Sequence, residues 1–73
     1  MVEYNIQSAI DYLNLIISQR KEVNESKFGL KLNIVDDSNN VIDYITNYYN
    51  SQGISCAMKY CVLERDYEII IWW

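Results

Sequence analysis

The stretch that decides the fold is EIIIWW, residues 68–73, in which three isoleucines and two tryptophans follow a glutamate. β-Branched and aromatic residues are enriched in strands, so we expect a strand over residues 67–73. Side chains alternate between the two faces of a strand. If the odd-numbered residues face the helices, Ile70 and Trp72 lie on the opposite face, and a register slip of one residue exchanges the two sets.

A second strand-like run, residues 54–63, comes just before this stretch. The polar Glu64-Arg65-Asp66 separates the two runs, and so short a connection predicts an antiparallel hairpin. Alternation places Ala57, Cys61 and Leu63 on one face of this strand. The other face is also apolar, and it carries Ile54, Cys56, Met58, Tyr60 and Val62. Both faces of the hairpin are therefore rich in apolar side chains.

A third strand is predicted over residues 28–35, where apolar and other residues alternate. Phe28, Leu30, Leu32 and Ile34 share one face, and Gly29, Lys31 and Asn33 share the other. The three strands, numbered along the chain, can lie in the order 1-2-3 or 1-3-2. The second order places the tryptophan strand in the centre, antiparallel to both neighbours.

Two helices are predicted from apolar residues at three- and four-residue spacing. The first covers residues 3–21, with Asn24 at its exit, and the second follows Asp36-Asp37-Ser38-Asn39-Asn40. Asp37 or Ser38 is the expected N-cap of the second helix, and Gly53 is the expected left-handed residue at its end. The apolar stripes are formed by Ile6, Ala9, Ile10, Leu13, Ile16 and Ile17 in the first helix and by Val41, Ile42, Ile45, Tyr48 and Tyr49 in the second.

These elements define a two-layer α+β fold in the order α-β-α-β-β. We expect one compact domain over residues 1–73, because a chain of this length has room for a single core. Its three-stranded sheet is mixed or antiparallel, and both helices pack on one face of it. In the alternative arrangement, the two helices cover opposite faces of the sheet and leave neither face open.

The charge pattern argues against several classes of partner. The net charge is −4, from ten acidic and six basic residues, and the basic residues form no cluster beyond Arg20-Lys21. We therefore expect no direct binding of nucleic acid and no membrane binding. Asp36, Asp37 and Asp43 form a local acidic patch, which leaves an acidic nucleic-acid mimic as a minor alternative. Because neither an apolar run of about 18 residues nor a basic N-terminal region is present, we expect a location in the cytoplasm or a host cytoplasm.

The composition also narrows the possible chemistry. The chain contains no histidine, so the usual base for a serine or cysteine nucleophile and imidazole ligands for a metal are both lacking. Cys56 and Cys61 fall on opposite faces of one strand and cannot bridge each other there. Two isolated glycines make no phosphate-binding loop. We expect neither an enzyme nor a cofactor or metal site, and we interpret the carboxylates of residues 64, 66 and 68 as solubilising groups of the hairpin.

Several apolar residues lie outside the predicted core. Because they would be exposed on an isolated chain, they predict a protein interface. Tyr4, Tyr12 and Leu15 lie opposite the apolar stripe of the first helix. On the sheet, the predicted interface residues are Trp72, Ile70, Leu63 and Cys61. We therefore expect a small homodimeric protein-binding module that occupies the surface of another protein, as an inhibitor or modulator. A phage or mobile-element protein that blocks a host defence factor is one example. The alternative is a small structural subunit whose apolar face is buried in a larger complex.

Overall fold

The alternating and amphipathic segments become four strands and two helices in the computed structural model, which describes residues 2–35 and 40–73. The α+β class is therefore confirmed, although the sheet has one strand more than the three that were predicted. The elements are β1 (Glu3–Tyr4), α1 (Ile6–Glu22), β2 (Lys27–Ile34), α2 (Val41–Asn50), β3 (Ser55–Cys61) and β4 (Asp66–Trp72).

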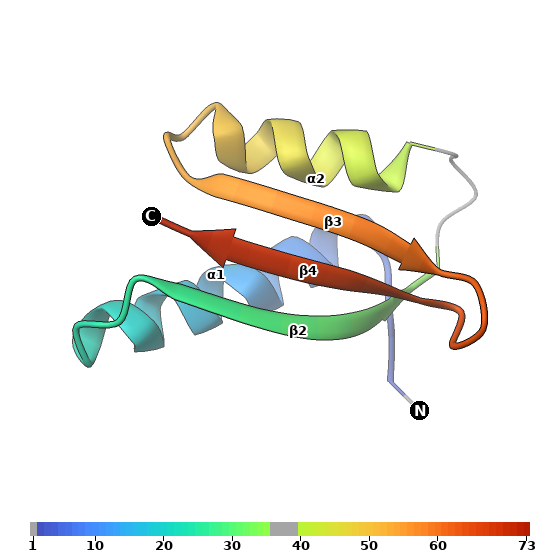
Figure 1. Cartoon of the computed structure of the whole chain (residues 1–73), viewed down its shortest axis with the longest axis horizontal. Coiled ribbons are helices and arrows are strands. Elements are labelled where there is room, and N and C mark those ends of the chain that lie inside the picture. The colour runs from blue at the N-terminus through green and yellow to red at the C-terminus, as the bar shows by residue number, and fades with distance from the viewer. Residues whose placement is uncertain (1, 36–39) are drawn as a thin grey trace.

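The tryptophan strand β4 lies inside the sheet, which has the order β1-β2-β4-β3 (Figure 1). β4 is antiparallel to both β2 and β3, as the second of the two predicted orders requires. β2 and β3 consequently run in the same direction, and α2 connects them. β1 pairs in parallel with the end of β2, where Glu3 lies opposite Asn33 and Tyr4 lies opposite Ile34.

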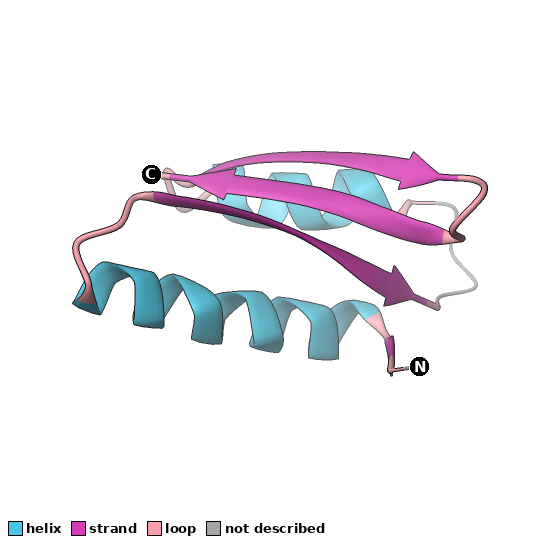
Figure 2. Cartoon of the chain, turned by 60° about the horizontal axis from the view of Figure 1, so that its bottom comes forward, coloured by secondary structure: helices cyan, strands magenta, loops and turns pink. Residues whose placement is uncertain are grey.

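Both helices pack on one face of the sheet, and the core lies between the two layers (Figure 2). α1 packs against β2, and α2 packs against β3. The fully or almost fully buried side chains come from both helices and from β2 and β4. They are Ala9, Ile10, Leu13, Ile17, Phe28, Leu32, Ile34, Val41, Ile45, Tyr49, Ile69 and Ile71. Among residues 2–35 and 40–73, no helix covers the other face of β2, β3 and β4.

The first helix begins at Ile6 rather than at residue 3, so the prediction was wrong by three residues. Asn5 is the N-cap: its side chain accepts a hydrogen bond from the backbone of Ser8 at 2.8 Å, and the Ser8 hydroxyl accepts one from the backbone of Asn5 at 3.0 Å. This reciprocal pair satisfies backbone donors that have no partner within the helix. The preceding residues Glu3 and Tyr4 are extended and pair with β2 instead.

Both helices end at a residue in the left-handed conformation. Asn24 has φ 61° after α1, and Gly53 has φ 76° after α2, as was predicted for this glycine. The next amide in each case returns to the helix: Glu25 donates to the carbonyl of Arg20 at 2.9 Å, and Ile54 to that of Tyr49 at 3.0 Å. Both ends therefore have the hydrogen bond of a Schellman motif.

At the other end of α2, the predicted caps Asp37 and Ser38 lie outside the described residues. The helix is preceded by Asn40 in the N-cap position, and the Asn40 side chain makes no capping hydrogen bond within the part of the chain that is described.

The hairpin turn lies two residues earlier than predicted. β3 ends at Cys61 rather than at residue 63, and β4 begins at Asp66, which pairs with Cys61. The loop of residues 62–65 closes when the amide of Arg65 donates to the carbonyl of Cys61 at 2.8 Å, with Arg65 at φ 56°. Leu63 consequently lies in the turn and not on a sheet face, and 95% of its surface is exposed.

Candidate protein-interaction face

The sheet face turned away from both helices, which we name the outer face, contains three rows of aligned residues and, at its hairpin end, the pair Cys61 and Asp66. Each row takes one residue from β2, one from β4 and one from β3. The rows are Lys27–Trp72–Ser55, Gly29–Ile70–Ala57 and Lys31–Glu68–Lys59. Because side chains alternate along each strand, all nine residues lie on the same face, opposite the buried Phe28, Ile69 and Ile71.

Ile70 and Trp72 form the apolar centre of the outer face. They are 41% and 43% exposed, although they belong to an interior strand of the sheet. The neighbours of Ile70 in its row are Gly29 and Ala57, whose side chains are too small to cover it. A large apolar side chain between two small ones projects from the surface, so it can enter a pocket on a partner.

Charged side chains border this apolar centre. Lys27 lies beside Trp72, while Lys31 and Lys59 lie on either side of Glu68. The ammonium of Lys59 is 3.9 Å from the Glu68 carboxylate, and that of Lys31 is 3.8 Å from the Glu64 carboxylate. These exposed pairs are too long and too well solvated to add much stability. Around the apolar centre the outer face carries more basic than acidic side chains, although the whole chain has a charge of −4.

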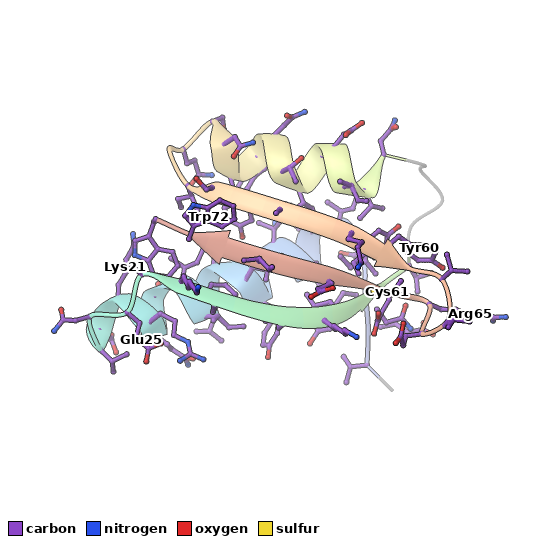
Figure 3. The ribbon with its side chains drawn as sticks, viewed as in Figure 1. Lys21, Glu25, Tyr60, Cys61, Arg65 and Trp72 are labelled. Carbon is purple, nitrogen blue, oxygen red and sulfur yellow. The ribbon has the colours of Figure 1, made fainter. Side chains whose placement is uncertain are left out.

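The predicted sheet residues do not all lie together. Trp72 lies near the end of β4, whereas Cys61 lies at the hairpin, at the opposite end of the outer face (Figure 3). Leu63 lies beyond Cys61 in the turn. The structure therefore brings together Ile70 and Trp72, and separates Cys61 and Leu63 from them.

The predicted helix residues form a different group, away from the outer face. Tyr4 of β1 stacks on Tyr12 of α1, with ring centroids 5.5 Å apart and ring planes at 22°. Tyr4 is half-buried against the core, and Leu15 is 55% exposed. The ring of Tyr12 also lines a groove of about 460 Å³ between α1 and β2.

The two cysteines are free thiols on opposite sides of the sheet, as alternation predicted. Burial raises the pKa of the Cys56 thiol to about 11, so this cysteine is a poor nucleophile. Burial, and then the neighbouring Tyr48, raise the pKa of the Tyr49 phenol well above its usual range. Both groups are neutral at physiological pH, as residues of a core should be.

A small group at the hairpin contains potential metal ligands. The ligand atoms of Cys61, Glu64 and Asp66 lie within 4.8 Å of one another, and Oδ1 of Asp66 is buried without a hydrogen-bond partner among the described residues. The Lys31 ammonium already supplies a positive charge beside Glu64. One thiol and two carboxylates are suitable donors for a cation, but they fall short of the usual four ligands of a structural zinc site.

The sequence prediction omitted the three lysines of the outer face. The sequence could have identified two of them. Alternation places Lys31 on the same face as Gly29, and Lys59 on the same face as Ala57. Lys27 lay before the predicted start of its strand. Of the acidic patch considered for nucleic-acid mimicry, Asp43 is exposed in the first turn of α2, while Asp36 and Asp37 lie outside the described residues.

Comparison with protein-family models, curated proteins and solved structures gives no match to this chain. Within residues 2–35 and 40–73, neither helix has the length and apolar character needed to cross a membrane. The fold and the outer face define an α+β domain with one uncovered sheet face. The functional interpretation therefore depends on the geometry of that face.

Proposed function

We propose that this protein is a non-enzymatic binding module that uses the outer face to occupy a surface of another protein. The observation that carries the proposal is the exposure of Ile70 and Trp72 on an interior strand of a sheet whose helices are both on the other side. Aromatic residues are enriched at the centres of protein interfaces, and charged residues at their rims. The outer face has this arrangement, with lysines around the apolar centre.

The rim charges favour a separate partner over a second copy of the chain. Lys27, Lys31 and Lys59 are three basic residues against two acidic ones, Glu68 and Asp66, among the residues that the register places on the outer face. A homodimer through this face would bring two basic rims together, whereas a partner with acidic groups around an apolar pocket complements the face. We propose inhibition or modulation of such a partner in the cytoplasm as the function, with the homodimer as a second use of the same face.

The test compares the protein with Trp72→Ala and with a control, Tyr44→Ala. Tyr44 is also an exposed aromatic residue, 55% exposed, but it lies on α2, on the other side of the molecule. Each purified form is immobilised and incubated with cell lysate, and the retained proteins are quantified. We expect proteins retained by the original chain and by Tyr44→Ala to be lost with Trp72→Ala. Equal retention by all three forms would contradict the proposal.

The oligomeric state is tested separately by size-exclusion chromatography with light scattering. A monomer at all concentrations excludes the homodimer but leaves the binding proposal standing. An obligate structural subunit, in contrast, is expected to aggregate when it is expressed alone.

A further inference from the structure

β2 has a backbone edge that the sheet leaves unpaired along most of its length. The amide of Trp73 donates to the carbonyl of Ser26 at 2.9 Å, so these two residues form a hydrogen-bonded pair at the start of the β2–β4 ladder. In an antiparallel ladder such pairs recur at every second residue. The backbone groups of Phe28, Leu30 and Leu32 therefore point toward β4, and those of Lys27, Gly29 and Lys31 point away from it.

The other end of β2 confirms that its odd-numbered residues point away from β4. It also shows where β1 pairs with this edge. The amide of Val35 donates to the carbonyl of Tyr4 at 2.7 Å, so the odd-numbered residues of this segment face β1. The register pairs β1 with Asn33 and Ile34, at the far end of β2 from Lys27. Within the described residues, no strand pairs with the edge between Lys27 and Lys31 (Figure 1).

A groove runs beside this open edge. It has a volume of about 460 Å³ and lies between the second half of α1 and the first half of β2. Apolar side chains from both elements line it, and so do the polar Gln19 and Arg20 of α1. The apolar ones are Tyr12 and Ile16 of α1, Val23 just after it, and Phe28 and Leu30 of β2. A strand added to the edge would turn every second side chain into this groove, because inward-facing positions of neighbouring strands are aligned.

We propose that the open edge of β2 binds an extended segment of a partner protein, in which apolar residues alternate with acidic residues. The backbone groups of Lys27, Gly29 and Lys31 pair with the added strand. The apolar side chains of the segment enter the groove, and its acidic side chains lie on the outer face beside Lys27 and Lys31. Gly29 lies between the two lysines, where the absence of a side chain leaves room for close approach.

The same charges argue against a second copy of this chain at the edge. An antiparallel pair of β2 strands centred on Gly29 would place Lys27 of each copy opposite Lys31 of the other. Like charges directly opposite each other on a sheet are destabilising. The outer edge of β3 is also unpaired among the described residues, but the groove that could receive side chains of an added strand lies along β2. This proposal does not depend on binding at Ile70 and Trp72, because it uses the backbone edge of β2 together with Lys27 and Lys31.

The experiment measures amide hydrogen exchange by NMR, with two capped peptides of about seven residues. In one peptide glutamate alternates with valine, and in the other lysine alternates with valine. We expect the glutamate peptide to slow exchange at Gly29 and Lys31 and to bind about tenfold more tightly than the lysine peptide. The amides of Phe28 and Leu30 should be protected with or without peptide.

Two variants of one residue test the backbone contact. Gly29→Pro removes an amide that points out of the sheet, so the β2–β4 ladder keeps its hydrogen bonds, and peptide affinity should fall about tenfold. Gly29→Ala keeps the amide. Its added Cβ would lie 3.6 Å from atoms of Ile69 and Ile70, which is an ordinary contact distance. Peptide affinity should therefore change less than about twofold. The double variant Lys27→Glu/Lys31→Glu tests the same edge if Gly29→Pro does not fold, and it should reverse the peptide preference.

Three results would overturn the proposal. The first is unchanged exchange at Gly29 and Lys31 with both peptides at about 1 mM, which corresponds to binding weaker than about 4 kcal/mol. The second is protection of these amides on raising the protein concentration alone, which identifies a second copy as the occupant. The third is peptide-induced protection along β3 in place of β2. Loss of lysate partners in Trp72→Ala is a separate result and tests the outer face alone.

Discussion

Trp72 and Trp73 are adjacent in the sequence but lie on opposite faces of the sheet. Trp72 is 43% exposed on the outer face. Trp73 packs on the helix side, where its ring meets that of Phe28 edge-on, with centroids 6.2 Å apart and ring planes at 64°. The two residues therefore have separate roles: Trp73 contributes to the core, and Trp72 is the exposed residue that we propose for binding.

Substitution of each tryptophan by alanine should separate these roles. Trp73→Ala should lower the free energy of unfolding by roughly 2 kcal/mol, below the roughly 3–5 kcal/mol of a fully buried ring, because Trp73 is only half-buried. Trp72→Ala should lower it by less than about 1 kcal/mol. Urea denaturation followed by circular dichroism measures both values. A larger loss from Trp72→Ala than from Trp73→Ala would contradict this assignment of faces.

Much of the sheet could be predicted because its signal is local. Alternation along residues 67–73 placed Ile70 and Trp72 on the face away from the helices, and the structure has them there. The strand order was left open between two possibilities, because it depends on contacts between segments that are distant in sequence. Pairs such as Phe28 with Ile71 and Cys56 with the same Ile71 decide the strand order.

The missed features have no periodic pattern of their own. β1 has two residues, too few to alternate, and it forms because Glu3 and Tyr4 pair with residues about thirty positions later. The hairpin turn was misplaced because a non-glycine residue, Arg65, takes a positive φ. The open edge of β2 was also beyond prediction, since it depends on where β1 stops pairing. Alternation correctly placed Ile70 and Trp72 on the exposed face, but it also placed Leu63 on a sheet face, whereas the structure has it in the turn.

Tyr49 links the two helices and offers a test of a buried polar contact. Its ring is fully buried, and its hydroxyl donates to Oδ1 of Asn14 at 2.9 Å, with the Ile10 carbonyl oxygen at 3.3 Å. Tyr49→Phe should lower the free energy of unfolding by about 1 kcal/mol, because the half-buried Asn14 loses its donor. Tyr44→Phe, at an exposed position, is the control and should leave the free energy of unfolding unchanged. Equal stability of the two variants in thermal unfolding would refute a role for the hydrogen bond.

The two glycines differ in conformation, so the same substitution should affect them differently. Gly53 has φ 76°, which strains any residue with a Cβ, and Gly53→Ala should therefore lower the free energy of unfolding by roughly 1 kcal/mol. Gly29 has no positive φ and has ordinary space for a Cβ, so Gly29→Ala should change the value by less than about 0.5 kcal/mol. Chemical denaturation of both variants gives the comparison. A cost at Gly29 as large as that at Gly53 would show that strand packing, rather than backbone strain, dominates.

The stability of the fold should decrease in alkaline solution because of two acids on the helix side of the sheet, the half-buried Cys56 and the fully buried Tyr49. Burial raises the pKa of Cys56 from its ordinary value near 9 to about 11 and also raises the pKa of Tyr49. Between pH 9 and 11 the unfolded chain releases the Cys56 proton while the folded chain retains it. A folded state that holds more protons than the unfolded state loses stability as the pH rises. The contribution of Cys56 is thus fully present below pH 9 and is lost as the pH rises toward 11.

Cys56→Ala isolates the contribution of the thiol. This variant lacks the group that titrates, so its free energy of unfolding should decrease less steeply between pH 9 and 11 than that of the original chain. Urea denaturation at several pH values, under reducing conditions, measures the two slopes. Cys61→Ala is the matched control, because it removes a thiol from the other side of the sheet while keeping Cys56. If Cys56→Ala keeps the full alkaline slope, the loss of stability comes from Tyr49 or other groups, and the packing of Cys56 against the core does not control it.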